Sequence, residues 1–194
     1  MDRTETEALG HDRYAPRESA SGGNAAEEGR PILSVQAASV ALAPAAIGAR
    51  VVAFIVDAIV LLLIQILLGS IVGDITVVGS VARAAIYAAI GFLYFGYSWT
   101  AWRASPGQRI LGLVTVNAAD GSTLNWSQAT VRWAWLFGPS VLSSLLQFGA
   151  LAAIGGIVVF GYGIYLLYTA ATDPRKQGFH DKQAGTIVAV KTAA

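Results

Sequence analysis

An arginine and an aspartate interrupt a strongly apolar stretch of the chain, ARVVAFIVDAIVLLLIQILL, at Arg50 and Asp57. In a helix this spacing corresponds to roughly 700° of rotation, so both side chains lie within about 20° of one face. The same spacing separates them by about 10 Å along the helix axis, which is too far for an easy direct ion pair. We therefore expect each charge to have its partner on another segment.

The composition places the chain among membrane proteins. Of its 194 residues, 55% are hydrophobic and only 13% are charged, and the apolar residues form long runs between short polar patches. A formal net charge of +1 indicates no nucleic-acid partner. The absence of cysteine excludes disulfides and thiolate metal sites. The first 30 residues lack the apolar region of a secretory signal, so we expect the first membrane helix to direct insertion.

Apolar runs of suitable length predict four membrane-spanning helices, at about 47–68, 81–102, 129–147 and 150–170. Each provides close to the ~20 apolar residues that are needed to cross a ~30 Å hydrocarbon core. The last two come from a single run of about twice that length, which we divide near 147–149. Because the turn there contains almost no polar residue, one long helix is the alternative.

The basic residues predict that both termini are cytoplasmic, because cytoplasmic loops carry an excess of lysine and arginine. On one side of the predicted spans lie Arg103, Arg109, Arg132, Arg175, Lys176, Lys182 and Lys191. With this orientation the five tryptophans fall near the cytoplasmic interface, where indole rings prefer to lie. We expect a multi-pass protein of the cell (plasma) membrane, with the lipid bilayer as its main partner.

Residues 1–43 precede the expected membrane domain, which covers residues 44–190. The first 30 residues are polar and rich in glycine, serine and glutamate, so we expect a disordered cytoplasmic tail followed by a mildly apolar lead-in. An unidentified protein is a candidate partner of this tail.

Three segments outside the spans have strand character. They are Leu113–Asn117, the STLNW segment at 122–126 that follows a turn at 119–121, and Thr186–Lys191. A two-stranded ribbon alone is marginal, and a third strand would help it. The predicted fold class is therefore an all-α membrane protein, a four-transmembrane-helix bundle with a small cytoplasmic β element built from the middle loop and the C-terminal tail.

Asp57 is the candidate functional group of the first span. It lies about 15 Å from a helix start at Ile47, close to the bilayer midplane, whereas Arg50 can extend its guanidinium to the headgroups. A carboxyl at this depth favours its neutral form and can exchange a proton. Side chains that could line a polar path with it are Tyr87, Tyr94, Ser140, Ser144 and Gln147. The alternative is that Asp57 and the serines are ordinary packing contacts between helices.

Arg50, Asp57 and Asp181, the last in GFHDKQAGT, resemble the signature of the RDD family of bacterial membrane proteins, which is named for one arginine and two aspartates. PGQRILGLVTV with the DG turn after it is similar to that family's middle loop, and HDKQAGTIVAV is similar to its closing segment. The resemblance covers about residues 44–190. It implies a protein of the bacterial inner membrane that transports an unknown ligand, some members being suggested cation/proton antiporters. Of the family's characteristic residues, the resemblance assigns only Arg50, Asp57 and Asp181 in this sequence.

Two functions remain open. The first is a small transporter or cation/proton antiporter with Asp57 as the exchanging carboxyl, and four helices are few for enclosing a path, so this function implies a homo-oligomer. The second is a membrane scaffold or accessory protein in which the charged residues are structural.

We also expect Asp181 to approach Arg50 and to clamp the tail to the base of the first helix. The alternative is an exposed surface turn, where charge pairs contribute little. No catalytic set of serine, histidine and aspartate has a plausible order, and the chain has only 2 histidines. We therefore expect no enzyme activity, no metal site and no cofactor.

Overall fold

The computed structural model describes residues 43–72, 77–145 and 150–191. These residues are mostly helical, with three long apolar helices and a small antiparallel sheet of two strands. Its elements are α1 (Ile47–Val72), α2 (Val77–Ala101), α3 (Pro106–Ile110), β1 (Leu113–Asn117), α4 (Trp126–Leu145), α5 (Ala150–Thr172), α6 (Phe179–Ala184) and β2 (Thr186–Val190). The tail expected at 1–43 lies outside the described residues up to position 42.

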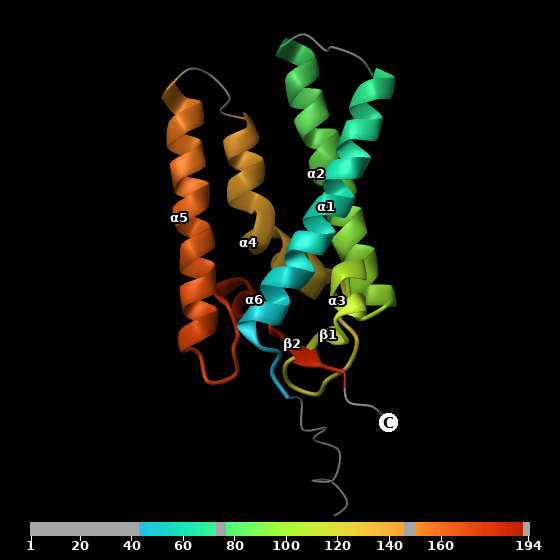
Figure 1. Ribbon diagram of the computed structural model, residues 1–194, viewed down its shortest axis with the longest axis vertical. Helices are drawn as coiled ribbons and strands as arrows, with labels where there is room; N and C mark the ends of the chain where they lie inside the picture. The colour runs from blue at the N-terminus through green and yellow to red at the C-terminus, as the bar shows by residue number, and fades with distance from the viewer. Residues whose placement is uncertain (1–42, 73–76, 146–149, 192–194) are drawn as a thin grey trace, which may run out of the picture. The chain divides into compact units, whose positions relative to one another are not determined.

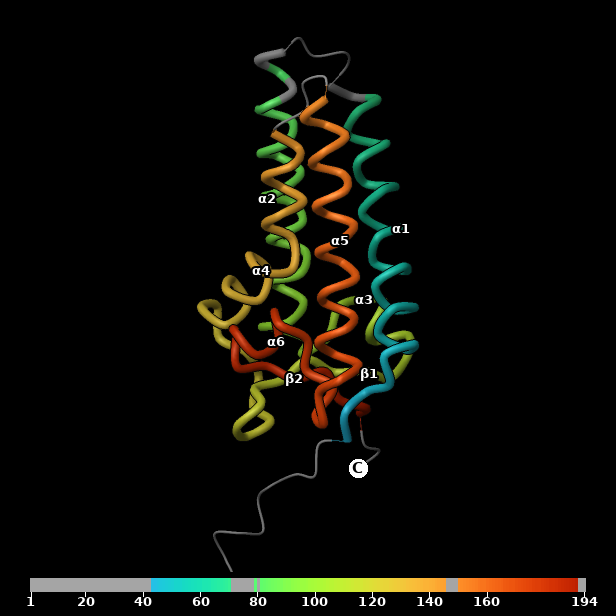
Figure 2. Tube along the Cα trace, turned by 90° about the vertical axis from the view of Figure 1, so that its left-hand side faces the viewer, coloured from blue at the N-terminus to red at the C-terminus, as the bar shows by residue number. Residues whose placement is uncertain are grey.

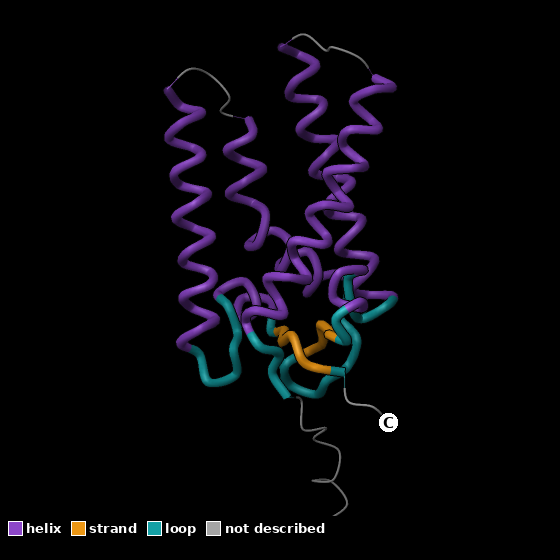
Figure 3. Tube along the Cα trace, in the orientation of Figure 1, coloured by secondary structure: helices purple, strands orange, loops and turns teal. Residues whose placement is uncertain are grey.

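Helices α1, α2, α4 and α5 run alongside one another, and the short elements gather at one end of them (Figures 1 and 2). We call this end, which holds α3, α6, β1 and β2, the sheet end; Figure 3 shows the two strands there. Within the described ranges, three helices are long and apolar enough to cross a membrane, at Ile47–Ser70, Val81–Ala101 and Ala150–Thr172. Their outer faces remain bare, with Leu63 61% and Phe160 72% exposed, as lipid-facing surfaces require. The chain is a multi-pass membrane protein.

The long apolar run after residue 128 forms two helices, because α4 ends at Leu145 and α5 begins at Ala150. The alternative of one long helix is therefore wrong. Pro139 lies inside α4, and α4 changes direction along its length (Figure 1). Proline has no N–H for the carbonyl four residues earlier, which belongs to Trp135. The hydroxyl of Tyr162 on α5 donates a hydrogen bond to this carbonyl instead.

The sheet joins the middle loop to the C-terminal segment, as the sequence predicts. Strand β1 pairs antiparallel with β2, with Leu113 opposite Val190 and Asn117 opposite Thr186. The segment before α1 adds an isolated bridge between Pro44 and Ala189. The base of α1 is therefore tied to the sheet at the point where the helix begins.

The prediction that STLNW returns as a strand is wrong, because its last residues start a helix. The side chain of Asn125 accepts from the backbone N–H of Gln128 at 2.8 Å, and the side chain of Gln128 accepts from that of Asn125 at 3.2 Å. This reciprocal cap satisfies donors that the first turn of α4 leaves unpaired. Leu124 is buried in a cluster with Phe95 and Trp99 of α2, so α4 starts against α2.

Candidate functional site

Asp57 accepts three hydrogen bonds inside the protein. The hydroxyl of Tyr94 on α2 donates to Oδ1 at 2.8 Å, and the backbone N–H of Gly107 donates to the same oxygen at 2.8 Å. The hydroxyl of Ser105 donates to Oδ2 at 2.5 Å. Asp57 is only 2% exposed, so the carboxylate faces protein and is screened from lipid. The expectation that it finds its partners on other segments is confirmed.

Helix α3 supplies two of these donors, and sequence analysis did not identify it. Ser105 is its N-cap residue, Pro106 stands in its first turn, and the Gln108 side chain accepts from the Ser105 backbone N–H at 2.9 Å. Serine followed three residues later by glutamine, with proline between them, is a capping-box pattern that could have revealed this helix.

Gly107 is required for the close approach of α3 to α1. A Cβ atom at this position would lie 2.1 Å from the backbone oxygen of Ala53 and 3.0 Å from the carboxyl carbon of Asp57. Any side chain would therefore push α3 away from α1 and withdraw the backbone donor from Asp57.

The donors to Asp57 approach it from the sheet end. Two of its donors belong to the segment after α2, and α2 ends at Ala101. The third donor, Tyr94, lies in the last two turns of that helix. The segment after α2 therefore reaches the level of Asp57, which lies ten residues after the start of α1.

The other candidate path residues do not gather around Asp57. Tyr87 donates to the backbone oxygen of Gln65 at 3.3 Å, and Ser144 donates to the backbone oxygen of Val141 within its own helix at 2.6 Å. Ser140 lines the cavity described below, and Gln147 lies outside the described residues. Of the four members that the structure describes, only Tyr94 donates a hydrogen bond to the carboxylate.

Asp181 is the centre of a second buried cluster, formed by two arginines. Arg50 lies 3.3 Å from its Oδ2, which confirms the expected contact, and Arg132 of α4 donates to its Oδ1. Asp181 is 0% and Arg132 is 3% exposed. Oδ2 also accepts from the backbone N–H of Gly178 at 3.0 Å, so the carboxylate caps the start of α6.

Each arginine has further acceptors or contacts. Arg50 donates to the backbone oxygens of Lys176 at 2.5 Å and Val188 at 2.8 Å. Arg132 donates to the hydroxyl of Thr186 at 2.7 Å, and its guanidinium lies 4.9 Å from the ring centroid of Trp99. From the sequence alone, Arg132 is identified only as one of the basic residues that set the topology.

The charges around Asp181 determine its protonation. Burial alone raises the pKa of a carboxyl, but here Arg132, with His180 and Arg50, outweighs burial and holds the pKa of Asp181 below its usual value. Burial, together with the nearby arginines, outweighs the opposing pull of Asp181 and lowers the pKa of His180 to about 4. At neutral pH the cluster therefore contains two cations, one anion and a neutral imidazole.

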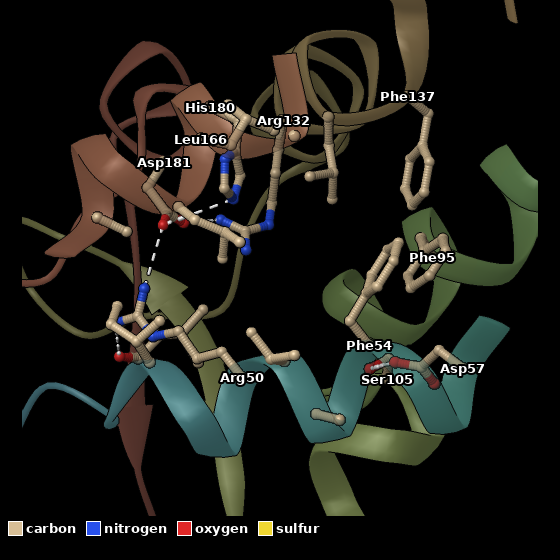
Figure 4. Close-up of a pocket in the computed structure, with 18 of the residues that line it drawn as sticks. Arg50, Phe54, Asp57, Phe95, Ser105, Arg132, Phe137, Leu166, His180 and Asp181 are labelled. Atoms are coloured by element: carbon tan, nitrogen blue, oxygen red, sulfur yellow. Dashed lines mark hydrogen bonds and ion pairs between the residues drawn. The ribbon is translucent and has the colours of Figure 1, made fainter. Parts of the chain in front are cut away.

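The two clusters face one cavity, which we call the central cavity (Figure 4). It has a volume of about 500 Å³ and is lined by residues of α1, α2, α4, α5 and α6, including Arg50, Asp57, Arg132, His180 and Asp181. Phe54, Phe95 and Phe137 line it opposite the arginines (Figure 4). Within the described residues no group of three or more His, Cys, Asp and Glu is placed to hold a metal ion. The arrangement suits the binding of a small molecule with one polar end.

Comparison with known families gives a match to the RDD family over residues 44–185. No curated protein and no solved structure matches the chain. The matched segment covers well over half of the sequence and begins where the chain joins the sheet, before α1. It includes Arg50, Asp57 and Asp181, the three charges that converge on the central cavity. The chain therefore belongs to the RDD family.

Proposed function

We propose that the protein is a small membrane transporter that takes its substrate into the central cavity. The observation that carries this proposal is that Arg50, Asp57 and Asp181 line one cavity, although they come from opposite ends of the domain. A packed helix bundle has few voids larger than a water molecule. A cavity of about 500 Å³ that is lined by buried charges is in the size range of small-molecule sites.

Within this proposal, Asp57 exchanges a proton and does not bind a metal cation. A bound cation would need several oxygen ligands, whereas the groups that meet Asp57 are donors. The hydroxyls of Ser105 and Tyr94 can each rotate to accept a hydrogen bond. A protonated carboxyl therefore keeps a partner without movement of the backbone.

The proposal includes four membrane crossings, with α4 as the fourth. The chain enters α4 beside α2 at the sheet end, and α5 begins five residues after the end of α4. If α5 crosses the membrane towards the sheet end, α4 must carry the chain to the far side first. The N-terminal half of α4 contains the buried Arg132 and lies at an angle to the C-terminal half (Figure 1). Helix α4 is for this reason less apolar than the other three proposed spans.

We further propose that the sheet end is cytoplasmic, because it holds the excess of lysine and arginine. The chain has no native cysteine, so single cysteines can be placed at Thr123, at the sheet end, and at Ser70, near the far end of α1. In intact cells a membrane-impermeant maleimide should label Ser70→Cys and not Thr123→Cys. The reverse labelling would overturn this orientation.

Flux measurements on the full chain in vesicles test the transport proposal. Proteoliposomes with a trapped pH-sensitive dye receive gradients of Na⁺, K⁺ and Li⁺ in turn, with protein-free vesicles as the blank. We expect proton movement with the wild type, its loss in Asp57→Asn, and its retention in the matched control Asp173→Asn. Proton movement that survives in Asp57→Asn, or none with any gradient, contradicts the role of Asp57 in antiport. Chemical cross-linking in the same vesicles tests the homo-oligomer that a four-helix transporter implies.

A membrane scaffold or accessory protein is the second candidate function, and one observation favours it. The oxygens of Asp57 and Asp181 already accept hydrogen bonds from the protein itself, as structural anchors do. If Asp57→Asn lowers the melting temperature in detergent and no variant changes any flux, the anchoring role accounts for the residue.

A further inference from the structure

Four buried nitrogen atoms at one end of the central cavity have no hydrogen-bond partner among the described residues. They are Nε of Arg50, Nε1 of Trp99, Nε of Arg132 and Nδ1 of His180. All four residues line the central cavity. The imidazole of His180 is neutral and turns Nε2 towards Asp181 at 3.6 Å, so the unpartnered donors are the N–H groups of Arg50, Trp99 and Arg132, which we call the donor cluster. Buried polar side-chain atoms in folded proteins nearly always have a partner. Three unpartnered donors around one cavity indicate a ligand that brings hydrogen-bond acceptors.

The charge balance at this end also favours an anion. Arg50 and Arg132 share a single carboxylate, Asp181, so one positive charge remains without a counterion in the cluster. The carboxylate of Asp57 lies about 10 Å further along α1 and is covered by its own three donors. Planar guanidinium groups match the oxygens of carboxylates and phosphates, which strengthens the preference for an oxyanion.

The remaining walls are largely apolar and continue onto the lipid-facing surface. Phe137 and Leu166 line the inside of the cavity, and Phe54, Phe160 and Leu167 line it while remaining 45%, 72% and 48% exposed. The cavity wall between α1 and α5 therefore continues into surface that acyl chains contact. A molecule with an apolar chain can reach the donor cluster from the bilayer without leaving an apolar environment.

We infer that the central cavity binds an anionic amphiphile, a carboxylate or phosphate oxyanion carried on an apolar chain. The oxyanion accepts from the donor cluster, and the chain lies along Phe54, Phe137 and α5. This inference rests on the cavity of the proposed function and names the chemical class of the ligand that the cavity holds. A bilayer phospholipid and a free alkyl carboxylate share this chemistry.

Two glycines of α5 provide a matched pair of variants. A Cβ atom at Gly163 or at Gly161 meets no atom within 4 Å, so both positions accept a side chain. Gly163 lines the cavity, whereas Gly161 is exposed and is not among the lining residues. Gly163→Phe therefore fills the cavity, and Gly161→Phe adds the same ring to the outside of the same helix.

Binding to the full chain in dodecyl maltoside micelles is measured by saturable quenching of tryptophan fluorescence. The probes are 11-bromoundecanoate, the neutral 11-bromoundecanol and the cationic 11-bromoundecylammonium. We expect the carboxylate to bind at least about tenfold more tightly than either of the others, because it forms charge-assisted hydrogen bonds. Gly163→Phe should weaken its binding at least about tenfold, and Gly161→Phe should leave it unchanged. Leu167→Phe, which adds no tryptophan to the fluorescence signal, is the second filling variant if Gly163→Phe does not fold.

Equal binding of the alcohol or the ammonium probe overturns the inference, as does unchanged carboxylate binding in a folded filling variant.

A second experiment identifies the source of the ligand, using nanodiscs of phosphatidylcholine with or without phosphatidylglycerol. Phosphatidylglycerol that stays with the purified wild type and is lost from Gly163→Phe indicates a lipid, whereas carboxylate binding alone indicates a free amphiphile. Carboxylate binding without any flux would support the anionic ligand and contradict the transport proposal. Cation-coupled proton flux without carboxylate binding would support the transport proposal and contradict the anionic ligand.

Discussion

Replacement of Asp181 by asparagine tests whether the buried charge cluster holds the sheet end together. Asparagine has nearly the same shape and keeps one carbonyl oxygen for the backbone N–H of Gly178, so the main change is the loss of negative charge. Arg50 and Arg132 would then face each other without a counterion, at positions where their side chains are only 13% and 3% exposed.

The expected loss is large because burial leaves neither arginine free to regain water. Removal of one partner from a buried ion pair costs about 3–5 kcal/mol of unfolding free energy. Native proteins have only ~5–15 kcal/mol in total. For a chain of this size each kcal/mol corresponds to about 2–4 °C in melting temperature, so we expect a decrease of roughly 10 °C.

Thermal unfolding of the full chain in detergent, at neutral pH, measures this decrease. Asp173→Asn is the matched control, since Asp173, whose side chain is 12% exposed, pairs at 2.6 Å with Lys182, which is 50% exposed and can regain water. A pair with one solvent-exposed member contributes about 1 kcal/mol or less, so the control should lose at most ~4 °C.

A decrease in melting temperature in Asp181→Asn no larger than in Asp173→Asn would refute the claim that Asp181 neutralises two buried arginines. A double-mutant cycle provides the second criterion. Arg50→Gln and Asp181→Asn should be non-additive, because residues in contact are energetically coupled. Simple additivity would show that Arg50 and Asp181 do not interact in the folded protein.

Three further predictions concern single contacts. Burial holds the pKa of His180 at about 4, against 6.5 for an ordinary histidine, so between these two pH values the unfolded chain binds a proton that the folded chain does not. The free energy of unfolding should therefore rise by roughly 3 kcal/mol from pH 4 to pH 6.5 in the wild type and far less in His180→Phe. Melting curves over this pH range measure the difference. Gly107→Ala should lower the free energy of unfolding by about 1–3 kcal/mol, because the added methyl group overpacks the contact between α3 and α1. Gly138→Ala, whose Cβ meets no atom within 4 Å, should leave the free energy of unfolding unchanged or raise it slightly in the same melting experiments. Tyr162→Phe should lower the free energy of unfolding by about 1 kcal/mol, because the backbone oxygen of Trp135 loses its donor. This loss should disappear in a Pro139→Ala background, where the backbone N–H at position 139 supplies that hydrogen bond. A loss of the same size in both backgrounds would argue that Tyr162 does not replace the missing helix donor.

The helices could be predicted from the sequence, because long apolar runs leave few alternatives. The sheet could be predicted only in part. The segments 122–126 and 186–191 both have strand character, and local pattern alone does not choose between them as partners of β1. The choice depends on Asn125 and Gln128, whose reciprocal cap starts α4 and removes the first segment from competition.

The candidate site was predictable where a charge lay in an apolar segment, and not where its partner lay in a loop. Arg50 and Asp57 stand out in the sequence for that reason. Arg132 does not, because the predicted helix began at 129 and left it near the membrane edge, whereas α4 begins at Trp126. Recognition of the Asn125 cap would have placed Arg132 well inside the helix and made it a candidate partner of Asp181.

The two signature aspartates have different structural roles. The donors to Asp57 come from α2 and α3, so this carboxyl holds together the first helical hairpin and the segment that follows it. Asp181 instead links Arg50 of α1 to Arg132 of α4, across the two hairpins. Helices α2 and α4 are already packed together by aromatic side chains. A widening of the cavity that separates α1 from α5 would stretch the Arg50–Asp181 ion pair, which joins α1 to α6. In a transporter built this way, Arg50→Gln should change the exchange between cavity conformations, whereas Asp57→Asn should change what is carried with the substrate.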